Sequence, residues 1–213
     1  MRFLVILIVC GAIGVAVQMP TAKTQNPPKG SDAIHQLFIE DGEEIRQSPS
    51  KFSEEEYMAR LKVRQTKVRA LLSAGELKTG EDFHEASFIF QHGNNSEDCL
   101  FAHVLAMEAV LKGSDEAKWI EAATLDRYLQ SIAQPQVFGT QYPLDPSLSH
   151  SAAGSQAQFL TGRTLAPYNE QFLPDSARLD FCVPALAQQK QNVAMFNAGK
   201  RPTDTMRAPG CPR

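Results

Sequence analysis

The chain lacks the motifs that usually reveal a reaction. It contains no GxSxG serine signature, no phosphate-binding loop, no GxGxxG and no HExxH. The common serine hydrolases, nucleotide-binding enzymes and zinc proteases therefore have no support from motifs. Basic residues form no block and the formal net charge is −3, so nucleic acid is not expected as a partner.

Cysteine is scarce, with four residues in 213. Cys10 falls in the N-terminal segment, which leaves three cysteines in the body of the chain. We expect a disulfide between Cys182 and Cys211, because it would tie the proline-rich tail to the rest of the protein. Cys99 lies in the first turn of an apolar helix and is expected to be a buried, inert thiol.

Long hydrophobic runs are also missing, apart from one at the N-terminus. Phe3–Ile13 is apolar over 11 residues, which is too short to span a bilayer as a mature helix. Arg2 precedes it, and Gly14 and Ala16 supply small residues, so we predict a secretory signal cleaved after Ala16. An uncleaved anchor is the alternative, and lipid attachment at Cys10 is disfavoured. The mature protein is expected in the periplasm or outside the cell, without membrane contact.

Helix-start signals divide the middle of the chain. Ser53 with Glu56, and Thr79 with Asp82, have the spacing of capping boxes. Ser96 and Ser114 are expected to cap two further helices. The predicted helices cover residues 53–75, 80–92, 96–113 and 114–133.

The fold expected from this pattern is mainly α, with antiparallel helical hairpins forming a four-helix core. Eight of the 13 prolines lie in residues 143–213, so that part is expected to be irregular, with a small β-hairpin around Thr161-Gly162 and a last helix over Val183–Asn197. The predicted segments are a signal peptide at 1–16, a linker at 17–50 with a short helix around Ile34–Ile39 as an option, the helical core at 51–142 and the C-terminal segment at 143–213.

An acid on an apolar helix face is the most informative polar residue. Asp126 shares its face with Trp119 and Ala122, and a carboxylate placed there must be paired or shift its pKa. His84 and His103, on preceding helices, are the expected partners. One interpretation is a His–Asp couple for general-base chemistry, with His84, His103 and Asp126 as catalytic candidates. The other is a buried polar network that fixes helix register.

A zinc site built from the same three residues is chemically conceivable, because imidazole and carboxylate ligands suit zinc. The chain has no HExxH, no paired cysteines and no Asp-rich loop. We therefore expect no metal site and no cofactor.

The segment PQVFGTQ at residues 135–141 follows the last predicted core helix. Gly139 permits unusual backbone angles, and its polar neighbours offer donors and acceptors at close spacing. One interpretation is a ligand-contacting loop. The other is that the glutamines tie the chain onto helix carbonyls. The candidate ligand-binding residues are Gln91, Arg127, Gln136, Thr140 and Gln141.

Four short elements occur in a fixed order: QHG at 91–93, AH at 102–103, DR at 126–127 and PQVFGTQ at 135–141. Residues 82–142 thereby resemble an uncharacterised family of bacterial proteins, often exported, with a weaker echo in Pro174-Asp175, Arg178 and Val183-Pro184. The resemblance implies a shared helical core and a shared polar pocket, and it supplies no catalytic residue. The short helices with facing alanines also resemble tetratricopeptide or Sel1-type hairpins.

These observations favour a binding or interaction module with a polar pocket near the GTQ loop. Its partner would be an unknown protein or small-molecule ligand. The alternatives are a hydrolase-like enzyme that uses the His–Asp couple, and a structural envelope protein whose polar residues serve only packing.

Overall fold

The computed structural model describes residues 30–47, 51, 53–145, 162–203 and 205–212. The predicted signal segment lies outside these ranges. Within them the protein is mainly helical, which confirms the expected fold class. The helices are α1 (Gly30–Gln47), α2 (Glu54–Ser73), α3 (Gly80–Gln91), α4 (Ser96–Leu111), α5 (Ala117–Ser131), α6 (Asp175–Asp180) and α7 (Leu186–Asn197).

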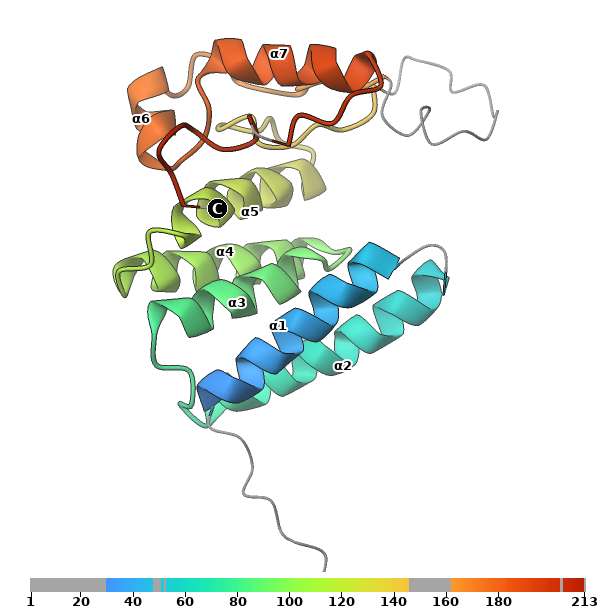
Figure 1. Cartoon of the computed structure of the whole chain (residues 1–213), viewed down its shortest axis with the longest axis vertical. Helices are drawn as coiled ribbons and strands as arrows, with labels where there is room; N and C mark the ends of the chain where they lie inside the picture. The colour runs from blue at the N-terminus through green and yellow to red at the C-terminus, as the bar shows by residue number, and fades with distance from the viewer. Residues whose placement is uncertain (1–29, 48–50, 52, 146–161, 204, 213) are drawn as a thin grey trace, which may run out of the picture.

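The helices are stacked along the long axis of the molecule (Figure 1). The pair α1 and α2 packs on α3, α4 lies between α3 and α5, and the C-terminal segment with α6 and α7 covers the outer side of α5. In the described part of the chain no helix combines the length and the apolar character needed to cross a membrane.

Helix α1 corrects the predicted linker at 17–50. Residues 30–47 form a regular helix of 18 residues. Its buried residues include Ile34, Leu37 and Asp41, which recur at helical spacing. The third of these is an acid, so the buried stripe has little hydrophobic signal. The core therefore contains five helices rather than four.

The capping boxes of α2 and α3 are present as predicted. The Glu56 backbone N–H donates to Ser53 Oγ, and the Asp82 backbone N–H donates to Thr79 Oγ1. The cap of α4 is Asn95 rather than Ser96, because the Asn95 side-chain oxygen accepts from the Asp98 N–H at 2.9 Å.

Helix α5 begins at Ala117, not at Ser114. The Ser114 N–H donates to the Ala109 carbonyl, and the Gly113 N–H donates to Val110. Both bonds close the end of α4 in the Schellman pattern, with Gly113 in the left-handed region at φ +88°. Ser114 therefore ends one helix rather than starting the next.

Apolar side chains from all five N-terminal helices form the core. One cluster joins α1 to α4, and a second, rich in alanine, lies between α4 and α5. The small residues let these helices approach closely. The fully buried large side chains of the first cluster include Ile34, Leu61, Val68, Ile89 and Phe90.

The C-terminal segment is fixed by polar contacts and one covalent bond. Cys182 and Cys211 form the predicted disulfide, and Cys99 is a buried free thiol, also as predicted. The last helix ends at Asn197 as expected but begins at Leu186, three residues later than predicted. Arg178 is buried and donates to Tyr168, Asp175 and the Glu170 carbonyl.

The described residues contain no β-strand, only isolated bridges. One of these joins Leu144 to Arg163. The first half of the hairpin predicted around Thr161-Gly162 lies outside the described residues.

Candidate functional site

Asp126 is completely buried, and its carboxylate accepts hydrogen bonds from the PQVFGTQ segment. One carboxylate oxygen accepts from the Val137 and Phe138 backbone N–H groups at 2.8 and 3.0 Å. The other accepts from the Thr140 N–H and hydroxyl at 2.9 and 2.8 Å. Burial raises the pKa of Asp126, and these donors oppose the rise. The carboxylate therefore organises the loop.

The histidines expected to pair with Asp126 lie elsewhere. His103 Nδ1 contacts the Glu121 carbonyl at 3.0 Å. His84 lies near Glu81, with 3.7 Å between His84 Nδ1 and Glu81 Oε1. Among the described residues, the donors to Asp126 are all in the loop, so the His84/His103–Asp126 couple predicted from the sequence is wrong. Three backbone N–H groups and the Thr140 hydroxyl of the loop are the donors instead, because the loop folds back over this face of α5.

Both glutamines of the segment bond to backbone groups, but only Gln141 reaches a helix carbonyl, as the second interpretation of the sequence predicted for both. Gln136 Nε2 donates to the Gln141 and Leu165 carbonyls, and its oxygen accepts from the Gln141 N–H. Gln141 Nε2 donates to the Ala123 carbonyl of α5 at 3.3 Å. These hydrogen bonds hold the loop in one conformation against α5.

Gly139 is required by both conformation and space. Its φ is +79°, in the left-handed region. A Cβ there would lie 2.5 Å from Gln189 Oε1 on α7. Gln189 in turn donates to the Phe138 carbonyl at 2.7 Å. The loop is thus clamped between α5 and α7.

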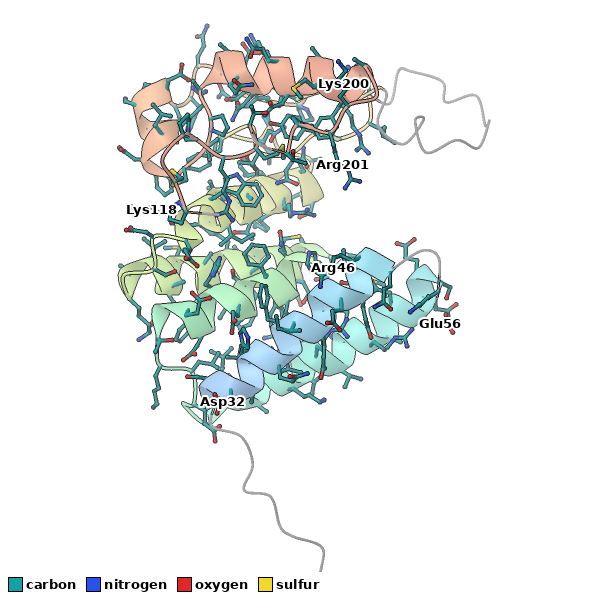
Figure 2. The ribbon with its side chains drawn as sticks, viewed as in Figure 1. Asp32, Arg46, Glu56, Lys118, Lys200 and Arg201 are labelled. Atoms are coloured by element: carbon teal, nitrogen blue, oxygen red, sulfur yellow. A yellow bond between two sulfur atoms is a disulfide. The ribbon has the colours of Figure 1, made fainter. Side chains whose placement is uncertain are left out.

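A cavity of about 430 Å³ opens beside this loop, between α5 and the C-terminal segment. Figure 2 shows Arg201 on the side of the C-terminal segment that faces α5. Three arginines and three aromatic side chains contribute to the wall. The lining residues are Trp119, Arg127, Thr140, Gln141, Tyr142, Arg163, Phe196, Arg201, Pro202, Thr203 and Met206.

The charged groups of the cavity are all positive among its described lining residues. Arg127 Nε is buried and has no hydrogen-bond partner in the described part of the protein. Burial lowers the pKa of Arg127. Burial and the nearby Arg201 charge lower the pKa of Arg163, whose Nη1 donates to the Tyr142 carbonyl. The cavity thus concentrates positive charge beside an apolar wall.

A larger hollow of about 520 Å³ lies between α1 and α2. Its wall consists of alanines, leucines and the stems of long polar side chains, among them Gln36, Glu40 and Lys67. Acidic and basic groups are mixed there, and no buried polar atom of its lining lacks a partner among the described residues. The smaller cavity therefore has the more specific chemistry.

The structure brings three of the five predicted ligand-binding residues together. Arg127, Thr140 and Gln141 line the arginine cavity. Gln91 is buried at the end of α3 and Gln136 is buried within the loop, and neither lines it. Arg163 and Arg201 also line the cavity but were not predicted, because they lie far from Arg127 along the chain and carry no local motif.

A His–carboxylate contact does occur, at a place that was not predicted. His92 Nδ1 lies 2.7 Å from Asp41 Oδ2. The same buried carboxyl group accepts from Tyr57 and from Arg64, whose Nη2 is 2.9 Å away. This network joins α1, α2 and the end of α3, so it acts as a structural clamp.

The chain was compared with protein-family models, with curated protein sequences and with solved structures, and none of the three comparisons gives a match. The resemblance of residues 82–142 to the QHG–AH–DR–GTQ proteins therefore stays a prediction from the sequence. The geometry of the arginine cavity has to support the functional argument by itself.

Proposed function

We propose that the protein is a binding module whose arginine cavity takes a small anionic ligand. The observation that carries this proposal is the buried Arg127 Nε, which has no hydrogen-bond partner among the described residues. Arg127 as a whole is partly exposed, and its buried Nε is a donor left without an acceptor, which costs about 1–3 kcal/mol. A bound carboxylate or phosphate would supply the missing acceptor, and the planar guanidinium suits either group.

The wall of the cavity defines the rest of the ligand. Trp119, Tyr142 and Phe196 offer apolar surface next to the arginines. A volume of about 430 Å³ lies in the range of small-molecule sites. We infer a carboxylate or phosphate ester with an apolar or aromatic body. A purely structural envelope protein would not need this concave site beside Gln141.

The test is isothermal titration calorimetry with phosphate, sulfate, acetate and benzoate as probes. The wild type is expected to bind at least one of them saturably at one site. Arg127→Gln should weaken that binding by about tenfold or more, since a charged hydrogen bond is worth about 1.5–3 kcal/mol. Arg201→Gln should weaken it as well.

Lys200→Gln is the matched control. Lys200 is an exposed neighbour of Arg201 and does not line the cavity, so its substitution removes the same charge without changing the wall. Its affinity should equal that of the wild type. Equal weakening by Lys200→Gln and Arg127→Gln would mean general charge attraction and would refute the site. Absence of binding by every probe would refute the proposal too.

We also propose that the protein acts outside the cytoplasm. The N-terminal signal pattern and the Cys182–Cys211 disulfide both favour an oxidising compartment. N-terminal sequencing of the mature protein should begin at Val17. A chain that starts at Met1 in the soluble cytoplasmic fraction would contradict export.

A further inference from the structure

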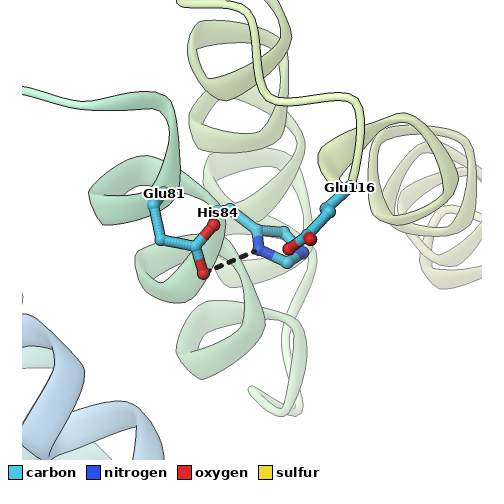
Figure 3. A group of neighbouring side chains, drawn as sticks. All are labelled: Glu81, His84 and Glu116. Carbon is cyan, nitrogen blue, oxygen red and sulfur yellow. Dashed lines mark ion pairs between the residues drawn. The ribbon is translucent and has the colours of Figure 1, made fainter. Parts of the chain in front are cut away.

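A second polar cluster lies where the start of α3 meets the turn between α4 and α5. Figure 3 shows Glu81 and His84, one turn apart on α3, together with Glu116 from the turn that leads into α5. Glu81 and His84 are three residues apart, which places them on one side of the helix. One ligand atom from each of the three residues lies within 4.8 Å of the others.

His84 has unmet hydrogen-bonding capacity at this cluster. The residue is only 8% exposed, and neither ring nitrogen has a hydrogen-bond partner among the described residues. The 3.7 Å from Nδ1 to Glu81 Oε1 is too long for a hydrogen bond. Buried polar side-chain atoms nearly always have partners, so this imidazole points to a missing ligand. Figure 3 shows the ring next to both carboxyl groups.

The backbone brings the three residues together through a close approach at Gly80. A Cβ on Gly80 would lie 2.9 Å from both the Ala109 carbonyl oxygen and Ser114 Cβ. Glycine therefore lets the start of α3 touch the α4–α5 turn. This contact places Glu81 next to Glu116, although 35 positions separate them in the sequence.

We propose that Glu81, His84 and Glu116 bind a divalent transition-metal ion, with zinc the best match. Imidazole favours such an ion over magnesium or calcium, and two carboxylates balance its charge. In a four-coordinate zinc site with bonds of about 2.1 Å, the ligand atoms lie about 3.4 Å apart. The ligand atoms lie within 4.8 Å of one another, so the two exposed glutamate side chains have to close by up to about 1.4 Å, which a change of rotamer can supply. A water molecule would complete four-coordination.

The surroundings of the three residues leave a path for a metal ion and contain few positive charges that would compete with it. A surface hollow of about 350 Å³ borders Glu81 and Glu116. Lys112 also borders it but is paired with Glu108 at 3.3 Å. Arg207 is a nearby positive charge that would repel a metal ion. Its guanidinium lies over the Trp119 ring and donates to the Pro212 carbonyl. The site is separate from the arginine cavity, and the two proposals do not depend on each other.

The test uses the mature chain after treatment with a chelator. Calorimetry with zinc chloride alone should give saturable binding of one ion, and thermal denaturation should move to higher temperature with zinc. Cobalt(II) should give the intense visible absorption of a four-coordinate site. Glu81→Gln and Glu116→Gln change exposed side chains, so they should fold, and each should weaken zinc binding by about tenfold or more. His84→Gln should do the same.

Asp115→Asn is the control, because Asp115 borders the same hollow but pairs with Lys118 at 2.7 Å. It should bind zinc as the wild type does. Two results would overturn the proposal. One is a wild type without saturable zinc binding. The other is equal weakening by Asp115→Asn and Glu116→Gln, which would mean diffuse attraction to surface acids.

Discussion

Single buried polar residues decide the shape of the C-terminal half. Asp126 has no exposed surface, and its two carboxylate oxygens accept four hydrogen bonds. Three of the donors are backbone N–H groups of one loop, which would otherwise be unsatisfied. The carboxylate therefore replaces the regular hydrogen bonding that a helix or strand would give.

Asp126→Asn is expected to destabilise the protein by about 2–4 kcal/mol, since an amide NH₂ group would face a backbone donor or leave it unpaired. Urea denaturation followed by circular dichroism measures the change. Arg127→Gln, the adjacent substitution, should cost much less, because Arg127 makes no comparable set of bonds. A loss of similar size in both variants would contradict the assigned role of Asp126.

His103 provides the pH-dependent prediction. Burial lowers the pKa of His103 below its ordinary value of 6.5, so the unfolded chain binds this proton more readily than the folded one. The contribution of His103 to stability is thus fully present above about pH 6.5 and is lost as pH falls toward the lowered pKa.

The wild type should therefore lose more unfolding free energy between pH 7.5 and pH 5 than His103→Gln does. Comparing the two chains cancels the opposite effect of Glu121, whose pKa is raised by burial. Parallel profiles of unfolding free energy against pH for the two proteins would mean that His103 has the same pKa in the folded and unfolded chains, which would contradict the prediction.

Residue-scale prediction from the sequence succeeded in part. That Asp126 needs partners follows from its place on an apolar helix face. That the partners are loop N–H groups could not be foreseen, because every residue except proline carries such a donor. His84 was singled out, but with the wrong companions, since Glu116 approaches only through the packing at Gly80.

Helices whose start signals lie within a few consecutive residues were predicted better than helices that depend on tertiary contacts. The starts of α2 and α3 were predicted because a capping box is complete within four residues. Helix α1 was predicted only as a short piece around Ile34–Ile39, because it has no comparable cap in the sequence and part of its buried stripe is polar. Its stability comes from tertiary contacts, including those of Asp41 with Arg64 and His92.

The PQVFGTQ loop supplies the element-scale prediction. Gly139→Ala combines a left-handed φ with a clash against Gln189, whereas Gly113→Ala has a similar φ and no atom within 4 Å of its Cβ. Gly113→Ala should cost about 1–2 kcal/mol, the penalty for a side chain in that conformation. Gly139→Ala should cost about 1–3 kcal/mol more because of overpacking.

Thermal denaturation of the two alanine variants checks this difference. The Gly113 variant serves as the control for backbone conformation alone. Equal melting temperatures would mean that the loop is not clamped between α5 and α7.

At the scale of the whole molecule, five stacked helices support a C-terminal segment that forms the outer wall of the arginine cavity (Figure 1). Helical class and the disulfide followed from composition and cysteine placement. The cavity did not, because Arg127, Arg163 and Arg201 meet only after the segment has folded back on α5. An anion bound by these arginines would join α5 to the C-terminal segment.

Trp119 allows the most direct measurement, because it is the only tryptophan of the chain and lines the cavity. Its fluorescence should change saturably as benzoate or phosphate is added to the wild type. Arg127→Gln should shift the midpoint to about tenfold higher concentration or more, a change of at least about 1.4 kcal/mol in binding free energy. Identical titration curves for the wild type and Arg127→Gln would contradict the account.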